Sequence, residues 1–208
     1  MIDPEKFYDA LSEGSMDKVK DLTQKALDAG EAPEKILKGG LIPAMDRIGE
    51  RFRNNDIFIP EVLIAARAMH AGLGVLKPAL AKSSSSAAAK VVIGTVKGDL
   101  HDIGKNLVGM MLEGAGFEVV DLGIDVAPEK FIQGAKENGA KIIGMSALLT
   151  TTMMQMKTTV EKIKSDGLAI KTVIGGAPVT AEFAKQIGAD GYAPDAASAV
   201  SKVKEILK

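Results

Sequence analysis

In residues 91–208, short apolar runs alternate with stretches of helical periodicity, and this alternation constrains the fold more than any other feature of the chain. The apolar runs cover 91–96, 117–121, 142–146, 172–174 and, more briefly, 191–193. The helical stretches lie between and after them, at 101–114, 128–138, 152–165, 181–186 and 196–207. Strand–helix alternation at this spacing predicts a parallel sheet with helices on both faces. The C-terminal part of the chain is therefore expected to be an α/β domain.

The expected arrangement is a five-stranded sheet in the flavodoxin-like, or Rossmann-like, strand order. Residues 1–82 instead show helical periodicity throughout and predict an antiparallel bundle of four helices, the last starting near Pro60. Residues 83–90 contain four consecutive serines and read as a linker. The predicted organisation is a helical domain at 1–82, a linker at 83–90 and an α/β domain at 91–208.

Composition excludes several classes of function. The net charge is −1, without the basic face that nucleic-acid binding needs. No apolar run is expected to reach the ~20 residues of a membrane span, and the N-terminus does not resemble a signal peptide. The chain has no cysteine, so we expect no disulfide, zinc–thiolate or iron–sulfur site, and a cytoplasmic location. With two histidines in 208 residues, a bound metal must bring most of its own coordination sphere.

Chemistry is expected at the carboxyl ends of the strands, where such sheets bind ligands. The loop after the first run holds His101, one of the two histidines, in the segment that joins a strand to a helix. The other strand ends offer hydroxyls or small residues. The candidate residues at the strand ends are Gly98, Asp99, Leu100, His101, Asp102, Ile103, Gly104, Ser146, Leu148, Thr150, Gly175, Gly176 and Ala177. Taken singly, each has a structural explanation, as a turn, a helix cap or a core residue; His70, within a helix, is read as structural.

Taken together, three blocks resemble the fingerprint of base-off, His-on cobalamin-binding domains. They are Asp99-x-His101-x-x-Gly104, then Ser146-x-Leu148, then Gly175-Gly176. The helical half resembles the cap of the cobalamin module of methionine synthase through residues 49–52 and 58–62. The whole chain is similar to the corrinoid proteins of methanol, methylamine and methoxyarene methyltransferase systems.

The resemblance implies a role for each of these residues. His101 would be the lower axial ligand of cobalt, with Asp99 holding its other ring nitrogen and Ser146 behind Asp99 as an axial-ligand relay. The nucleotide tail would enter a slot lined by Gly104, Ser146, Gly175 and Gly176. Thr150 and Ala196 would touch the corrinoid. Phe58, Val62 and Leu63 of the helical domain would cover the upper corrin face, which would explain the surplus apolar surface of the fourth helix.

The resemblance also implies a function as a methyl carrier with cobalamin, as methylcobalamin or a related corrinoid. The methyl group would pass to Co(I) from a donor-specific methyltransferase and from methyl-Co(III) to a second methyltransferase acting on tetrahydrofolate or a thiol. A reductive activation protein is a third implied partner, while nucleic acid and membrane are not expected. The chain would carry the group without catalysing the transfer alone.

Three other classes compete with this interpretation. A cobalamin-binding subunit of an adenosylcobalamin mutase shares the His101 fingerprint but usually lacks a helical domain such as residues 1–82. A cobalamin-dependent sensor adds a DNA-binding domain, and this sequence has no basic segment that would indicate one. A phosphoreceiver of flavodoxin-like fold needs an aspartate after the third strand, where this chain has Ser146.

Overall fold

The computed structural model describes residues 2–82 and 89–208, so the four serines of the predicted linker lie outside the described residues. The chain divides into two compact units. One comprises Met1–Ala87 with Glu113–Gly116, and the other comprises Ala88–Leu112 with Phe117–Lys208. The division into a helical domain at 1–82, a linker at 83–90 and an α/β domain at 91–208 stays a prediction.

The helical unit is built from four helical segments, two of which are capped by side chains. Ser15 accepts a hydrogen bond from the amide of Lys18 at 3.4 Å, and Asp3 accepts one from Glu5 at 3.2 Å, which satisfies amides that the helix starts leave free. The third segment is continuous but contains a π-helical turn. The segments are α1 (Pro4–Ser12), α2 (Met16–Asp28), α3 (Pro33–Ile36) with η1 (Leu37–Leu41) and α4 (Ile42–Arg53), and α5 (Ile59–Lys82).

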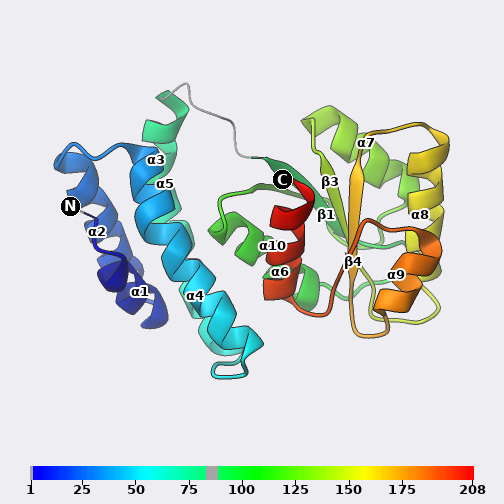
Figure 1. The fold of residues 1–208 in the computed structure, drawn as a ribbon, viewed down its shortest axis with the longest axis horizontal. Helices are drawn as coiled ribbons and strands as arrows, with labels where there is room; N and C mark the ends of the chain where they lie inside the picture. Colours follow the sequence, from blue (N-terminus) through cyan, green and yellow to red (C-terminus); the bar gives the residue numbers. More distant parts are fainter. Residues whose placement is uncertain (1, 83–88) are drawn as a thin grey trace. The chain divides into compact units, whose positions relative to one another are not determined.

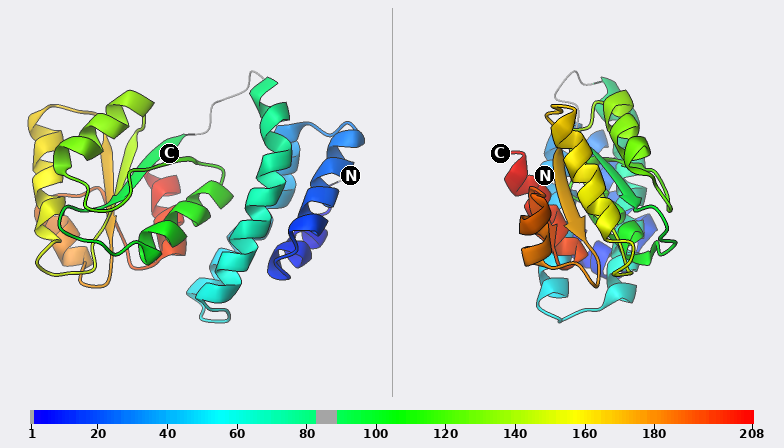
Figure 2. Two further views of the ribbon diagram at one scale, coloured as in Figure 1. Left: turned by 180° about the vertical axis from the view of Figure 1, so that it is seen from behind. Right: turned by 90° about the vertical axis from the view of Figure 1, so that its right-hand side faces the viewer.

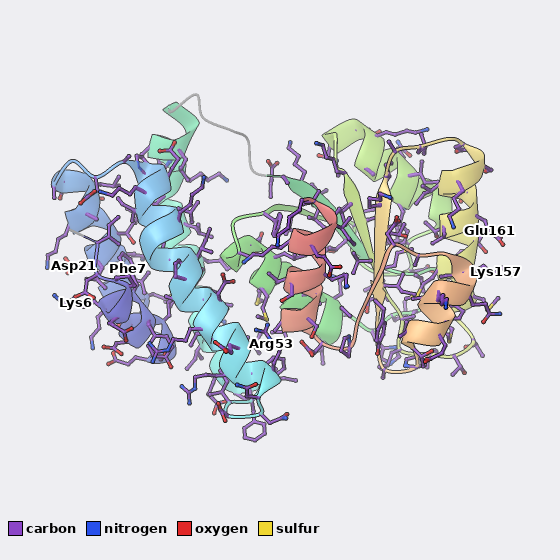
Figure 3. All side chains as sticks on the ribbon, viewed as in Figure 1. Lys6, Phe7, Asp21, Arg53, Lys157 and Glu161 are labelled. Carbon is purple, nitrogen blue, oxygen red and sulfur yellow. The ribbon has the colours of Figure 1, made fainter. Side chains whose placement is uncertain are left out.

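Helix α5 is the apolar helix of this unit and packs closely on its neighbours. A Cβ placed at Gly72 would lie 2.8 Å from Val19 and 3.0 Å from Leu41, so this glycine lets α5 approach α2 and η1. In Figure 3, Phe7 lies on α1 and is buried, whereas Lys6 and Asp21 carry their charges on the outside of α1 and α2.

Helix α5 contains no uninterrupted apolar run of about 20 residues, since Glu61, Arg67 and Lys77 divide it, but it passes a length-and-composition test for a membrane span. Its stretch Ile59–Leu80 is long and apolar enough to cross a membrane by length and composition. The helix is apolar on more than one face because it packs against α1, α2 and α4. In the structure, 39% of the apolar window is buried, and buried core helices pass the same test, so this finding is weak evidence for a membrane span.

The α/β unit confirms the predicted sheet. Five parallel strands pair in the order β2-β1-β3-β4-β5, which is the flavodoxin-like order. The strands are β1 (Lys90–Thr95), β2 (Glu118–Asp121), β3 (Ile142–Ser146), β4 (Lys171–Gly175) and β5 (Gly191–Ala193). The helices are α6 (Ile103–Gly114), α7 (Pro128–Asn138), α8 (Met154–Ser165), α9 (Ala181–Ile187) and α10 (Ala196–Ile206).

Helices cover both faces of this sheet. Helices α6 and α10 lie on one side of the strands, and α7 and α8 lie on the other (Figures 1 and 2). The core between the sheet and α7, α8 and α9 includes Phe131, Ile143 and Met156, which are completely buried. Lys157 and Glu161 pair at 3.8 Å on the opposite, outer side of α8 (Figure 3). The register places Thr95 beside Ser146, and Ser146 beside Gly175, so β1, β3 and β4 end level at one edge.

Candidate functional site

The loops that leave the carboxyl ends of the strands bring the candidate residues together at one edge of the sheet. The loop after β1 carries Asp99 and His101, and the loop after β3 carries Leu148 and Thr152. The two loops are joined through a single carboxylate, that of Asp99. Its position explains most of the geometry of the site.

Asp99 is completely buried, and both of its carboxylate oxygens accept hydrogen bonds. Oδ2 accepts from the amides of Leu148 at 2.8 Å and Leu149 at 3.2 Å, and from the Thr152 hydroxyl at 2.7 Å. Oδ1 accepts from the amide of His101 at 3.1 Å and lies 2.7 Å from its Nδ1. The buried charge is thus held by five hydrogen bonds from four residues, and a buried carboxylate is tolerated when it is bonded in this way.

The imidazole of His101 faces two environments. A carboxylate only accepts hydrogen bonds, so the contact with Asp99 places the proton on Nδ1 and leaves the Nε2 lone pair free. The side chain is 51% exposed, and no hydrogen bond joins Nε2 to any residue in 2–82 or 89–208. A neutral imidazole with one nitrogen held by a carboxylate and the other open is the arrangement of a metal-binding histidine.

Burial raises the pKa of the Asp99 carboxyl, but its hydrogen bonds lower it by more. The bond from the His101 ring lowers it most, followed by those from the Leu148 amide, the Thr152 hydroxyl and the His101 amide. The net result is a pKa well below the ordinary value of 3.8. Asp99 therefore stays anionic to a lower pH than an ordinary aspartate.

This low pKa predicts how Asp99 contributes to stability. Since its pKa is lower in the folded than in the unfolded chain, the ionised carboxylate stabilises the fold above the unfolded value of about 4, and that contribution is lost as pH falls from there toward the folded pKa. Asp99→Asn should lower the free energy of unfolding by about 2 kcal/mol near pH 7. The difference in free energy of unfolding between wild type and Asp99→Asn should become smaller below about pH 4. Urea unfolding of the two cofactor-free proteins, from neutral pH to below pH 4, measures this difference. A difference that does not change with pH would contradict the lowered pKa of Asp99.

The hydroxyl that donates to Asp99 belongs to a residue that the sequence analysis did not single out. Thr152, 8% exposed, donates to Asp99, whereas no hydrogen bond joins the Ser146 hydroxyl to Asp99 or His101 in the described part of the chain. The chain turns after β3, since the amide of Thr152 donates to the carbonyl of Leu149 at 3.1 Å, and this turn returns Thr152 to the carboxylate. Among the described residues, the hydroxyl that donates to Asp99 is therefore that of Thr152, and the relay role expected for Ser146 stays a prediction.

Several large apolar side chains in the segments at this edge of the sheet are exposed. Leu100 is 67% exposed and Ile103 is 73% exposed, on either side of the histidine. Three exposed apolar residues of the neighbouring segments had not been singled out by the sequence analysis: Ile124, Leu149 and Met154. Leu148, a candidate residue from the sequence, is 45% exposed. Large exposed aliphatic side chains gathered at a strand end indicate a surface for a large, partly apolar ligand.

The glycines of the predicted slot differ in what their surroundings require. A Cβ at Gly175 would lie 2.7 Å from the carbonyl oxygen of Ala193, and one at Gly176 would collide with the carbonyl of Ala147. The backbone itself therefore demands glycine at these two positions. A Cβ at Gly104 would have no neighbour within 4 Å, although glycine destabilises a helix. Gly104 thus leaves open space beside α6 that no residue of the described chain needs.

The remaining candidate residues lie as follows. Gly98 has a φ of +82°, and Asp102 accepts a hydrogen bond from the Asn106 side chain at 3.1 Å. Thr150 and Ala177 are exposed in the segments that follow β3 and β4, and Ala196 is buried in the first turn of α10.

On the helical unit, the three candidate residues differ in exposure. Phe58 is 65% exposed, Leu63 is half-buried and Val62 is completely buried. Their contacts with a corrin stay predictions.

The residues at this edge fit a corrinoid. Among the described residues, no group of three or more His, Cys, Asp or Glu side chains is placed to hold a metal ion. A metal here would be bound through His101, with its other ligands supplied by a macrocycle, and imidazole suits cobalt. The exposed aliphatic surface suits the corrin ring, and the open space at Gly104 suits an appended tail.

Comparison with known proteins gives concordant results. Two models of a B12 binding domain match, one over residues 89–201 and the other over residues 4–77. Trimethylamine corrinoid protein 1 of Methanosarcina acetivorans is 42% identical over 97% of this chain and 95% of its own length. The dimethylamine corrinoid protein of Methanosarcina barkeri is 43% identical over 98% of this chain and 96% of its own.

Solved structures agree with these relatives. A cobalamin-binding protein from Desulfitobacterium hafniense is 34% identical, with a TM-score of 0.83 over 99% of this chain and 98% of its own. A chain of the methanol:cobalamin methyltransferase complex of Methanosarcina barkeri is 30% identical, with a TM-score of 0.85 over 97% of this chain and 78% of that chain.

Proposed function

Because the chain belongs to the corrinoid proteins with B12-binding domains, whose cofactor is cobalamin or a related corrinoid, we propose that it carries methyl groups between two methyltransferases. The observation that carries the proposal is the Asp99–His101 pair. A buried carboxylate fixes Nδ1 at 2.7 Å and leaves Nε2 open to solvent beside an exposed aliphatic surface. This supports base-off, His-on binding, with His101 as the lower axial ligand of cobalt.

The residues of the site hold the ligand and its proton. When bound, the corrinoid supplies a cobalt centre that accepts a methyl group and releases it again. Asp99 keeps the proton of His101 on Nδ1, so that Nε2 remains a ligand atom. The carboxylate lies 2.7 Å from the ring nitrogen, so it holds the imidazole in place whether or not Nε2 is bound to cobalt. Thr152 and the amides after β3 keep Asp99 anionic in both situations.

The nucleotide tail is assigned to the space beside α6. Gly104 supplies the opening, while Ser146, Gly175 and Gly176 lie at the adjoining ends of β3 and β4. Thr150 and Ala196 are proposed as further corrinoid contacts. On the helical unit, Phe58 and Leu63 are proposed to shield the cobalt from water. Val62 is completely buried and would need to become exposed to join them.

The proposed partners follow from the carrier role. Dimethylamine and trimethylamine appear in the names of two relatives, and a methanol:cobalamin methyltransferase complex contains a third. Since proteins named for different donors are similar over nearly the whole chain, we assign the choice of donor to the partner methyltransferase. A second methyltransferase, acting on tetrahydrofolate or a thiol, would take the methyl group, and a reductive activation protein would restore the carrier. The proposed setting is the cytoplasm.

Reconstitution tests the proposed function. The purified chain mixed with hydroxocobalamin and desalted is expected to retain an equimolar corrinoid, measured by absorption. After reduction and treatment with methyl iodide, the retained corrinoid should be methylated and should lose its methyl group only when an acceptor methyltransferase and its acceptor are added. Failure to retain a corrinoid would remove the cofactor assignment. A methylated protein that no tetrahydrofolate- or thiol-methylating enzyme demethylates would contradict the carrier role.

A further inference from the structure

The loop that carries His101 is held from a second side by Asp125, in the segment between β2 and α7. The Asp125 carboxylate accepts a hydrogen bond from the amide of Gly98 at 2.7 Å. The amide of Asp125 donates to the carbonyl of Asp99 at 3.1 Å. One residue therefore contacts the two residues on which the His101 geometry depends, through its side chain and through its backbone.

The backbone of Asp125 is in an uncommon conformation. Its φ is +53°, and Asn55 is the other non-glycine residue with a positive φ in the described part of the chain. Aspartate tolerates the left-handed region better than most residues, but the conformation still costs free energy and persists where surrounding contacts hold it. Residues of this kind are concentrated at functional sites, and this one lies against the candidate ligand loop.

The segment that presents Asp125 is fixed to β1 beyond the end of β2. The amide of Thr95 donates to the carbonyl of Gly123 at 3.0 Å, and the amide of Val126 donates to the carbonyl of Thr95 at 2.9 Å. Val96 and Val126 form an additional parallel bridge. Asp125 is thus presented from a backbone that continues the sheet, and it is positioned independently of the loop that it contacts.

In the described part of the chain, the Gly98 amide donates to Asp125, while the other groups of the loop that carries His101 are held by different partners. Thr95 donates its hydroxyl to the carbonyl of His101 at 2.8 Å, and the loop after β3 binds the Asp99 carboxylate. Gly98, with a φ of +82°, lies in a region that few other residues adopt, and a glycine peptide rotates readily when it is not held. Rotation of this peptide would move the backbone of Asp99 and with it the carboxylate that orients His101.

We propose that Asp125 is a positioning residue for cobalt ligation. It fixes the Gly98–Asp99 peptide so that Asp99 holds the imidazole of His101 with Nε2 directed at the cobalt of a bound corrinoid. The role rests on the proposed function, since it has meaning only if His101 is the axial ligand. It differs from the role of Thr152, whose hydroxyl binds the Asp99 carboxylate, in that Asp125 acts through the Gly98 amide and the Asp99 carbonyl.

Two substitutions at Asp125 separate the hydrogen bond from the backbone conformation. Asp125→Gly retains the positive φ at lower cost but removes the acceptor for the Gly98 amide. Asp125→Asn retains an acceptor oxygen and also tolerates the positive φ. The matched control is Asp190→Ala. Asp190 also joins two segments, since it accepts from the Lys171 side chain at 2.8 Å and the Thr172 amide at 2.8 Å, but it lies at the opposite edge of the sheet.

The probe is cob(II)inamide, a corrinoid without the nucleotide tail and its base, bound to the full-length chain. Any axial nitrogen then comes from the protein, and it splits the electron paramagnetic resonance spectrum of the cobalt. Wild type, Asp125→Asn and Asp190→Ala are expected to show this nitrogen splitting and similar affinities. Asp125→Gly should lose most of the splitting and bind cobinamide about tenfold more weakly. Thermal unfolding of the cofactor-free proteins is measured in parallel, and only Asp190→Ala among the three variants should combine lower stability with intact splitting.

The outcomes distinguish this proposal from the function on which it rests. Absence of nitrogen splitting in the wild type would overturn ligation by His101 and the positioning role together. Splitting and affinity retained in Asp125→Gly would overturn the positioning role alone, as would an equal loss in Asp125→Asn. If Asp125→Gly does not fold, hydrogen exchange of the Gly98 amide in the cofactor-free wild type decides. Protection is expected, and exchange at the rate of an exposed loop amide would overturn the proposal.

Discussion

Replacing His101 with alanine is expected to weaken corrinoid binding by about a hundredfold and to remove the spectral signature of an axial imidazole. The side chain supplies the open nitrogen at the site, and no cluster of metal-ligating side chains in the described residues could replace it. Residual binding should persist, since the aliphatic surface around Leu100 and Ile103 and the space at Gly104 are unchanged. Absorption spectra and dissociation constants after reconstitution with hydroxocobalamin measure both effects.

The matched control for this substitution is His70→Ala, because His70 is the other histidine of the chain. It lies in α5 and is assigned no part in binding cobalt. Its replacement should leave the axial-imidazole signature of the bound corrinoid unchanged. A signature lost in His70→Ala and retained in His101→Ala would transfer the ligand role to the helical unit. Retention in both would show that the corrinoid keeps its own base, and the His-on assignment would then be wrong.

The architecture of the α/β unit could be predicted because periodicity and spacing determine it. Apolar runs separated by helical stretches leave few connections other than right-handed crossovers in a parallel sheet, and the observed strand order is the expected one. The start of a helix was less predictable where residues of the candidate site form its first turn. The helix expected from His101 begins at Ile103, since the amide of His101 is bound by Asp99 and its carbonyl by Thr95. Contacts made across the fold therefore decided where the helix could start.

The site was predictable for the residues whose roles are local in sequence. Asp99 and His101 are two positions apart, and their contact could be expected from the resemblance and was found. Thr152 could not be found by spacing alone, because its contact with Asp99 depends on the turn after β3. Asp125 gave no signal, since an aspartate in a loop has many ordinary explanations, and only its φ and its two partners distinguish it.

The glycines show a similar limit of inference from residue type. Gly104, Gly175 and Gly176 were grouped in the sequence as small residues that make room for a nucleotide tail. The structure separates them, because carbonyl groups of the chain itself exclude a side chain at Gly175 and Gly176 but not at Gly104. A substitution at Gly104 therefore tests the slot without disturbing the fold, whereas substitutions at the other two would first disrupt the sheet.

Replacing Gly104 with a larger residue should have opposite effects on stability and on binding. Gly104→Ala is expected to stabilise the cofactor-free protein by about 0.5 kcal/mol, because glycine disfavours a helix and a Cβ here meets nothing within 4 Å. The same methyl group would occupy the space assigned to the nucleotide tail, and Gly104→Leu would fill more of it. We expect cobalamin binding to weaken by at least about tenfold in Gly104→Leu, with Gly104→Ala intermediate. A tenfold loss of affinity corresponds to about 1.4 kcal/mol of binding free energy.

Cobinamide identifies the cause of that loss. Since it lacks the nucleotide tail, its affinity should change little in either variant, while that of cobalamin falls. The control is Gly74→Ala, at a second helical glycine whose Cβ would meet nothing within 4 Å. It should gain stability and leave both affinities unchanged. Equal losses for cobalamin and cobinamide in Gly104→Leu would mean that the space beside α6 holds the corrin ring, and unchanged affinities would mean that the tail lies elsewhere. In either case the assignment of the slot to Gly104 would have to be withdrawn, while the role of His101 would stand on its own test.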